Sequence, residues 1–155
     1  MAKNVFVSFD HSDTAQVNGL KLLNNNPNHP LDFRDHSLKE PVRDAYGRPI
    51  IYSPGDPRSK PVRDEIIAKF NNASKLVVLI GSNTASSEWV DWEIKTFYNM
   101  KYELSGENTW KRVRGMRLKG LDYSSIPNAL NGRSTEVMVW NPEMLDKWLD
   151  LDPDR

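Results

Sequence analysis

Residues 76–94, which spell LVVLIGSNTASSEWVDWEI, decide the fold of this chain. The first five residues, Leu76 to Ile80, are all aliphatic, as expected for a strand that is buried on both faces of a sheet. Gly81-Ser82-Asn83 ends this strand, and Val90 and Ile94 then follow at the spacing of one helix face. A buried strand that leads through a short polar loop into a helix is typical of a parallel α/β sheet.

Strand-like and helix-like segments alternate along the rest of the chain. We expect further strands at residues 4–10, 31–34, 113–118 and 136–140. We expect helices after the capping residues 10–13, across the apolar positions 62–70, at 87–104 and after Asn141-Pro142, with only a short helical turn at 124–130. This alternation predicts a flavodoxin-like three-layer α/β domain, with five parallel strands in the order 2-1-3-4-5 and helices on both faces.

Residues 41–61 interrupt the alternation, because five of the ten prolines and two glycines fall there. We expect a long surface loop inserted into a single domain that spans residues 1–155. Pro57 or Pro61 would suit the first turn of the helix that follows.

The composition excludes several classes of protein. The 21 basic and 21 acidic side chains cancel, so neither a nucleic acid nor an anionic membrane is an expected partner, and Lys111–Arg114 is interpreted as a solvated strand edge. The absence of cysteine excludes disulfides, thiolate zinc sites and a cysteine nucleophile. With no leader and no apolar run of roughly 20 residues, we expect a cytoplasmic protein.

Glu93 is the carboxylate that the predicted topology singles out. Ligands of such sheets bind at the carboxyl ends of the strands, near the switch point between strands one and three. The segments that follow the first three strands are 10–13, 34–37 and 82–84. Glu93 lies four residues after Trp89, on the same side of the adjoining helix and at the edge of its apolar face. The plain alternative is a boundary residue with a solvated carboxylate.

The segment Trp89-Val90-Asp91-Trp92-Glu93-Ile94 resembles the Trp-Val-x-x-Glu-Ile run of NAD-cleaving TIR domains, whose glutamate is catalytic. Residues 5–10 match the first TIR strand, and 76–81 match the strand before the catalytic helix. Residues 32–35, 115–118 and 137–141 look more like the TIR-like proteins of bacterial and archaeal defence systems, including the Thoeris anti-phage component. The resemblance covers roughly residues 4–150. The loop at 41–61 is longer than in animal and plant TIR domains, so recognition details of that loop are not carried over.

The resemblance implies that Glu93 is catalytic and that NAD is the substrate, with no resident cofactor. No metal is expected, because the sequence supplies no convincing set of converging ligands at suitable spacing. Nicotinamide would be released by a glycohydrolase or by a cyclase that makes a signalling isomer of ADP-ribose, read by a separate effector in anti-phage defence. The resemblance also implies a homo-oligomer, because TIR enzymes are often active only when assembled. The chain lacks the glycine-rich phosphate-binding motifs of dehydrogenases and ATPases, which agrees with NAD as a consumed substrate.

The candidate substrate-binding residues surround the same predicted edge. Phe9 and Trp89 offer aromatic faces for stacking, and Trp92 is a further aromatic candidate. Polar candidates are Asp10, His11, Ser82, Asn83 and Thr84, of which the last three lie near a helix N-terminus and would donate to a pyrophosphate. The alternatives are core packing for Phe9 and helix capping for the polar residues.

Two other functions stay open at this level. A TIR-like domain can act as an interaction module without catalysis, because fold does not imply function. A nucleoside deoxyribosyltransferase-like enzyme also places a glutamate on a flavodoxin-like sheet, and it would act on deoxynucleosides instead of NAD.

Overall fold

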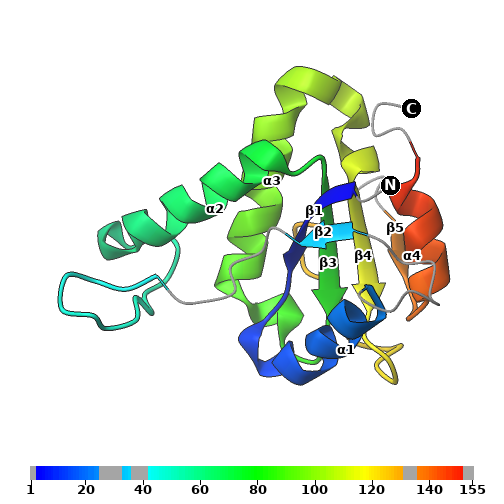
Figure 1. The fold of residues 1–155 in the computed structure, drawn as a ribbon, viewed down its shortest axis with the longest axis horizontal. Coiled ribbons are helices and arrows are strands. Elements are labelled where there is room, and N and C mark those ends of the chain that lie inside the picture. The colour runs from blue at the N-terminus through cyan, green and yellow to red at the C-terminus, as the bar shows by residue number, and fades with distance from the viewer. Residues whose placement is uncertain (1–2, 25–32, 36–41, 131–135, 152–155) are drawn as a thin grey trace.

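The computed structural model describes residues 3–24, 33–35, 42–130 and 136–151 (Figure 1). Within these ranges the strands form one five-stranded parallel sheet in the order β2-β1-β3-β4-β5. The strands are β1 (Lys3–Ser8), β2 (Phe33–Asp35), β3 (Lys75–Ile80), β4 (Val113–Arg117) and β5 (Glu136–Met138). The α/β class, the parallel sheet and its covering helices are confirmed.

The centre of the sheet is β3, which pairs with β1 on one side and with β4 on the other. All six of its residues are buried, as the aliphatic run at 76–80 predicts. The chain crosses from β1 to β2 at one edge and then returns to β3 on the opposite side of β1. The switch point of the sheet therefore lies at the carboxyl ends of β1 and β3.

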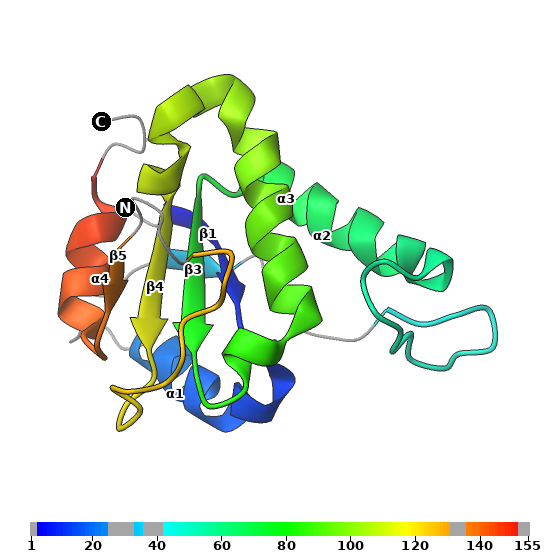
Figure 2. The same cartoon turned by 180° about the vertical axis from the view of Figure 1, so that it is seen from behind.

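Helices cover both faces of the sheet (Figure 2). They are α1 (Thr14–Asn24), α2 (Lys60–Asn72), α3 (Glu88–Ser105) and α4 (Pro142–Leu149). Apolar residues of α1 and α4 pack with Val5, Val7 and Val77 in one core cluster. Apolar residues of α2 and α3 pack with Phe6 and Val78 in the other cluster. Alternate residues of each strand thus point into opposite cores, as a pleated sheet requires.

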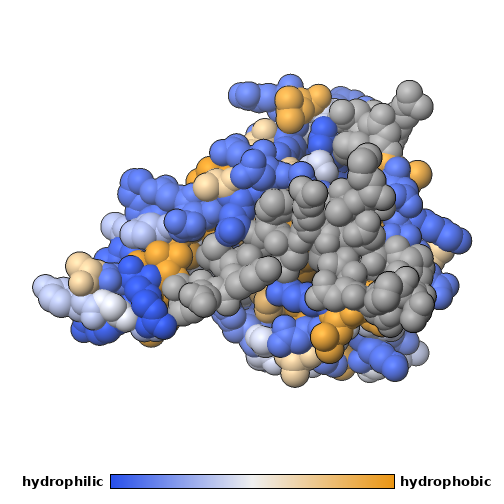
Figure 3. Space-filling view, viewed as in Figure 1, coloured by the Kyte–Doolittle hydropathy of each residue, from blue (hydrophilic) through white to orange (hydrophobic). Residues whose placement is uncertain are grey.

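The segment predicted as a loop at 41–61 is shorter than expected. A 3₁₀ helix occupies Pro57–Ser59 and α2 begins at Lys60, so both candidate prolines lie in first turns. Residues 42–56 and α2 project from the sheet, and this projection is mostly hydrophilic in the space-filling view (Figure 3). Tyr46 and Ile51 are exceptions, each 84% exposed.

Other expectations also needed correction. Within 124–130 only residues 128–130 form a turn, which the Leu130 N–H closes by donating to the Pro127 carbonyl, whereas Gly106–Arg112 form an unpredicted 3₁₀ helix. The Lys111–Arg114 stretch is not a simple solvated edge, because Arg112 is buried and its Nη1 donates to the carbonyl of Ser74 at 2.9 Å. Nothing in the sequence indicated that the Arg112 side chain would be buried and donate to a backbone carbonyl.

No helix among the described residues combines the length and the apolar character that crossing a bilayer would demand.

Candidate functional site

Glu93 lies in the second turn of α3 and is only 7% exposed. The helix begins where the Ser87 side chain accepts a hydrogen bond from the backbone N–H of Val90. The Val90 and Ile94 side chains, both fully buried, fix the rotation of this first part of the helix. This rotation turns Glu93 inward, so the solvated-boundary alternative is wrong.

The partner of Glu93 is Ser8, the last residue of β1. The Ser8 hydroxyl donates to Glu93 Oε1 at 2.9 Å, and Ser8 itself is 1% exposed. Ser8 pairs with Val78 in the sheet, next to the central strand. The carboxyl group of Glu93 therefore reaches the carboxyl end of β1, at the switch point of the sheet.

The burial of Glu93 changes its acidity. Loss of hydration raises its pKa from the usual 4.5 to about 8, and the hydrogen bond from Ser8 opposes that rise. The free protein consequently holds Glu93 mainly as the neutral acid at pH 7. A buried carboxyl group with so altered a pKa is a strong candidate for a functional group.

A second buried carboxyl group, Asp13, joins the loops that follow β1 and β3. Asp13 is 7% exposed, and burial followed by the charge of Asp10 raises its pKa. Thr84 Oγ1 lies 3.4 Å from Asp13 Oδ2 and accepts a hydrogen bond of 2.8 Å from the Gly81 N–H. A Cβ atom added to Gly81 would lie 2.3 Å from the Asp13 carboxylate oxygens, so this close approach requires glycine.

Most of the polar residues predicted to bind substrate form hydrogen bonds with residues of the loops that follow β1 and β3. The Asp10 side chain accepts from the Ser12 N–H at 3.1 Å, which caps the first turn. Asn83 Nδ2 donates to the Ser12 hydroxyl at 3.2 Å across the two loops. Thr84 is fully buried with the partners named above, and its hydroxyl accepts from the Gly81 N–H within the loop after β3, so it is not a helix cap. His11 and Ser82 are exposed.

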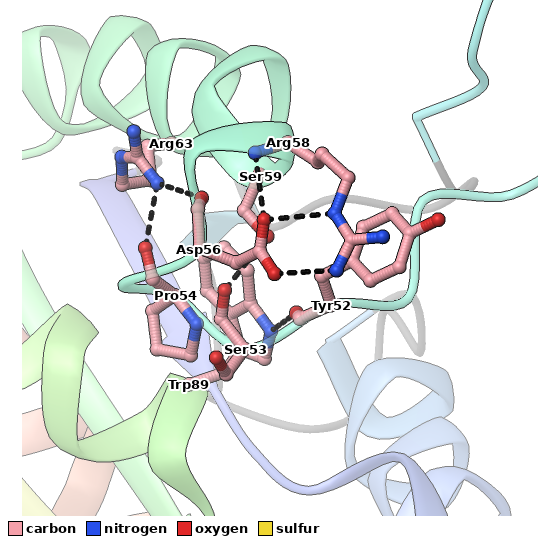
Figure 4. A network of polar contacts seen from close by, with 8 residues as sticks. All are labelled: Tyr52, Ser53, Pro54, Asp56, Arg58, Ser59, Arg63 and Trp89. Atoms are coloured by element: carbon pink, nitrogen blue, oxygen red, sulfur yellow. Dashed lines mark hydrogen bonds and ion pairs between the residues drawn. The ribbon is translucent and has the colours of Figure 1, made fainter.

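The aromatic candidates lie in different places. Phe9 packs against the α1–α4 core, while Glu93 belongs to the helix that covers the other face, so Phe9 fits the packing alternative. Trp89 is half-buried, and its ring meets that of Trp92 edge to face with 5.5 Å between centroids. Its Nε1–H donates to the carbonyl of Tyr52 at 3.0 Å and so ties the projecting loop to α3 (Figure 4).

Charged side chains at the end of the loop before α2 and in the first turns of the helices that follow hold this loop in place. Asp56 accepts from Arg58 Nη2 at 2.7 Å, and Arg63 Nη1 donates to the carbonyls of Pro54 and Asp56 at 2.6 and 2.8 Å (Figure 4). The Arg58 guanidinium also lies 3.5 Å from the centre of the Tyr52 ring. These contacts give the loop a defined shape beside the N-terminal half of α3.

A cavity of about 680 Å³ separates this loop from α3, and Glu93 is not among its lining residues. The helix contributes Glu88, Asp91, Trp92 and Lys95, which follow one another at the spacing of a single helix face. Among the residues that the structure describes, no cluster of three or more His, Asp or Glu side chains could hold a metal ion. The expectation of no metal stays a prediction.

Sequence reasoning missed Ser8 as a partner of Glu93. The available signal was a single hydroxyl in an otherwise apolar strand, a pattern that buried structural serines also produce. The segment 34–37 of the sequence prediction gives no further site residue, because the side chains of Arg34 and Asp35 and all of residues 36–37 lie outside the described part.

Comparison with known proteins shows the family to which this chain belongs. A family model described as the TIR-like domain of the Thoeris protein ThsB matches residues 6–114, which include Ser8, Asp13 and Glu93. A search of curated proteins found no match. The matched region covers most of the chain and runs from β1 to the start of β4, so the chain belongs to the Thoeris ThsB TIR-like domain family.

Proposed function

We propose that this protein cleaves the bond between nicotinamide and ribose in NAD, and that Glu93 stabilises the positive charge that develops on the sugar. The observation that carries the proposal is the buried Glu93 carboxyl group, bound by Ser8 at the switch point of the sheet. Membership in a Thoeris family supports anti-phage defence as the setting. The product would be a signalling isomer of ADP-ribose that a separate effector recognises.

The chemistry needs only one carboxylate. The bond between the pyridinium nitrogen and C1′ of the ribose breaks, and its electron pair leaves with neutral nicotinamide. The remaining oxocarbenium-like sugar is stabilised by the nearby negative charge of Glu93. Water or a hydroxyl group of the same molecule then attacks C1′ and loses its proton, which gives the linear or the cyclic product.

The raised pKa of Glu93 links catalysis to binding of the cation. A pyridinium ion placed near a neutral carboxyl group favours its ionised form and lowers its pKa. The substrate would therefore displace a proton from Glu93 as it binds. For the free protein, kcat/KM should rise with pH up to about 8, because only the ionised Glu93 assists the reaction.

The proposal also requires a movement. A side chain that is 7% exposed leaves no room for a ribose ring beside its carboxyl group. The resting protein would thus be inactive or slow until a trigger exposes Glu93. This requirement makes the presence of a trigger part of the experiment.

The test compares the wild type with Glu93→Gln and with Glu88→Gln, at high protein concentration. Glu88 lies on the same helix and is exposed, so its variant controls for changes in α3. Each protein is incubated with NAD, with and without lysate from phage-challenged cells, and nicotinamide and ribosyl products are followed by chromatography with mass spectrometry. We expect release by the wild type and Glu88→Gln, and a loss of at least about 100-fold in Glu93→Gln.

The other outcomes separate the alternatives. Silence of all three proteins in the presence of the trigger would favour the interaction module. Cleavage of deoxynucleosides without cleavage of NAD would identify the deoxyribosyltransferase-like reaction. Equal release by wild type and Glu93→Gln would remove Glu93 from the mechanism.

A further inference from the structure

We infer that Ser8 is a positioning residue that holds one oxygen of the Glu93 carboxyl group and leaves the other oxygen for the ribose. This inference rests on the proposed function, because the ribose is its substrate. It adds to the site a residue that does not touch the reacting atoms.

The hydrogen bond joins two rigid elements. Ser8 ends a strand whose preceding residues Val5, Phe6 and Val7 are at most 2% exposed. Glu93 lies on a helix that the fully buried Val90 and Ile94 hold against the sheet. The distance of 2.9 Å between Ser8 Oγ and Glu93 Oε1 is therefore fixed by the packing of the core.

The two oxygens of Glu93 have different surroundings. Oε1 accepts from Ser8, whereas Oε2 has no hydrogen-bond partner within the part of the chain that the structure describes. A carboxylate with one oxygen held loses the freedom to rotate both oxygens away from a substrate. The free oxygen would then face the developing cation in one defined orientation.

The same hydrogen bond also affects ionisation. A donor to the charged form of a carboxyl group favours that form, and Ser8 is the side chain that lowers the pKa of Glu93. Among the described residues no charged side chain contributes to this pKa, which burial otherwise raises. Removing the Ser8 hydroxyl should therefore leave Glu93 harder to ionise and less well oriented.

The test uses Ser8→Ala in the full chain, with Ser59→Ala as the matched control. Ser59 is also a fully buried serine, and its hydroxyl donates to the carbonyl of Ser53 at 2.7 Å, away from Glu93. The pKa of Glu93 is measured by NMR titration of its side-chain carboxyl carbon. Nicotinamide release is measured between pH 6 and 9.5 under the conditions that activate the wild type.

We expect Ser8→Ala to raise the pKa of Glu93 and to lower nicotinamide release at pH 7 by about tenfold. The loss should shrink as the pH rises, because ionisation is then restored and only the orientation remains impaired. Ser59→Ala should leave the pKa of Glu93 unchanged. A merely structural role of Ser8 would lower the amount of folded protein without moving the pH profile.

Two results would contradict different claims. If Ser8→Ala leaves both the pKa of Glu93 and the pH profile of release as in Ser59→Ala, the positioning role is overturned. If the wild type releases no nicotinamide under any condition, the proposed function fails. In that case the NMR titration still decides whether Ser8 controls the ionisation of Glu93.

Discussion

The two ends of the sheet bury charged groups in opposite ways. At the amino end three cations are at most 7% exposed, and they are Lys75, Lys101 and Arg112. Each donates to backbone carbonyls, and these include the carbonyls of Trp148, Phe70 and Ser74. Two of the acceptors lie in the last turns of α4 and α2, where the helix dipole favours a positive charge.

The carboxyl end of the sheet buries two acids instead. Burial raises the pKa values of Glu93 and Asp13, and among the described residues each of their carboxyl groups accepts a hydrogen bond from one side chain. Groups that are buried with so little compensation lower stability and are typical of functional sites. The buried charges at the amino end are compensated by backbone carbonyls, whereas the buried acids at the carboxyl end are not, as the proposed function requires of Glu93.

The largest effect should come from Glu93→Gln at alkaline pH. Below pH 4.5 Glu93 is neutral in both folded and unfolded chains, whereas between 4.5 and about 8 only the unfolded chain ionises. The wild type should therefore lose stability as the pH rises through this window, and the loss is complete above pH 8. Glutamine does not ionise, so the variant should be more stable at pH 9 by roughly 5 kcal/mol.

Urea unfolding at pH 5 and pH 9 measures this difference. At pH 5 the two proteins should agree within about 1 kcal/mol, since glutamine closely resembles the neutral acid. A variant that combines higher alkaline stability with lost nicotinamide release would show that this carboxyl group is kept at the expense of stability. An equal pH dependence in both proteins would mean that Glu93 is already ionised in the folded state.

A substitution at the amino end of the sheet should lower the stability of the protein, whereas Glu93→Gln should raise it at alkaline pH. Lys75→Met keeps the apolar stem but removes the donor that serves the carbonyls of Trp148 and Leu151. We expect a loss of about 3 kcal/mol in the free energy of unfolding, measured in urea, with the pKa of Glu93 unchanged.

Lys95→Met is the matched control for this lysine. Lys95 is exposed on α3 and pairs with Asp91 at 2.9 Å, so its loss should cost less than about 1 kcal/mol. A similar cost for both lysines would show that the buried cations do not stabilise the amino end.

The fold and the contacts at the two ends of the sheet could be predicted from the sequence to different extents. The apolar runs and the alternation of elements predicted the α/β class, the parallel sheet and the position of Glu93 at the edge of the apolar face of its helix, because hydrophobic periodicity is a local signal. The hydrogen bond between Ser8 and Glu93 joins residues 85 positions apart, so no local pattern records it. The burial of Arg112 was missed for the same reason, since its acceptor on Ser74 lies 38 positions away, between α2 and β3.

Gly81→Ala tests how tightly the two loops at the carboxyl end are joined. The new Cβ would overlap the Asp13 carboxylate and force it away from Thr84. We expect a loss of about 2 kcal/mol in the free energy of unfolding. Gly19→Ala is the control, because a Cβ at Gly19 in α1 meets nothing within 4 Å and should stabilise the helix by about 1 kcal/mol. An equal gain in both variants would show that Asp13 moves aside freely.

The smallest effect should come from Trp89→Phe, which removes the hydrogen bond to the Tyr52 carbonyl but keeps an aromatic ring. The network of Asp56, Arg58 and Arg63 still holds the loop, so we expect only about 1 kcal/mol of local destabilisation. Chymotrypsin should then cut after the exposed Tyr46 in this loop about five times faster than in the wild type, with Trp92→Phe as the control. Faster nicotinamide release by Trp89→Phe at unchanged global stability would mean that this loop restrains access to Glu93. Unchanged cleavage would instead show that the hydrogen bond from Trp89 to the Tyr52 carbonyl does not help to hold the loop. The movement that exposes Glu93 would then have to occur at another part of the carboxyl end of the sheet.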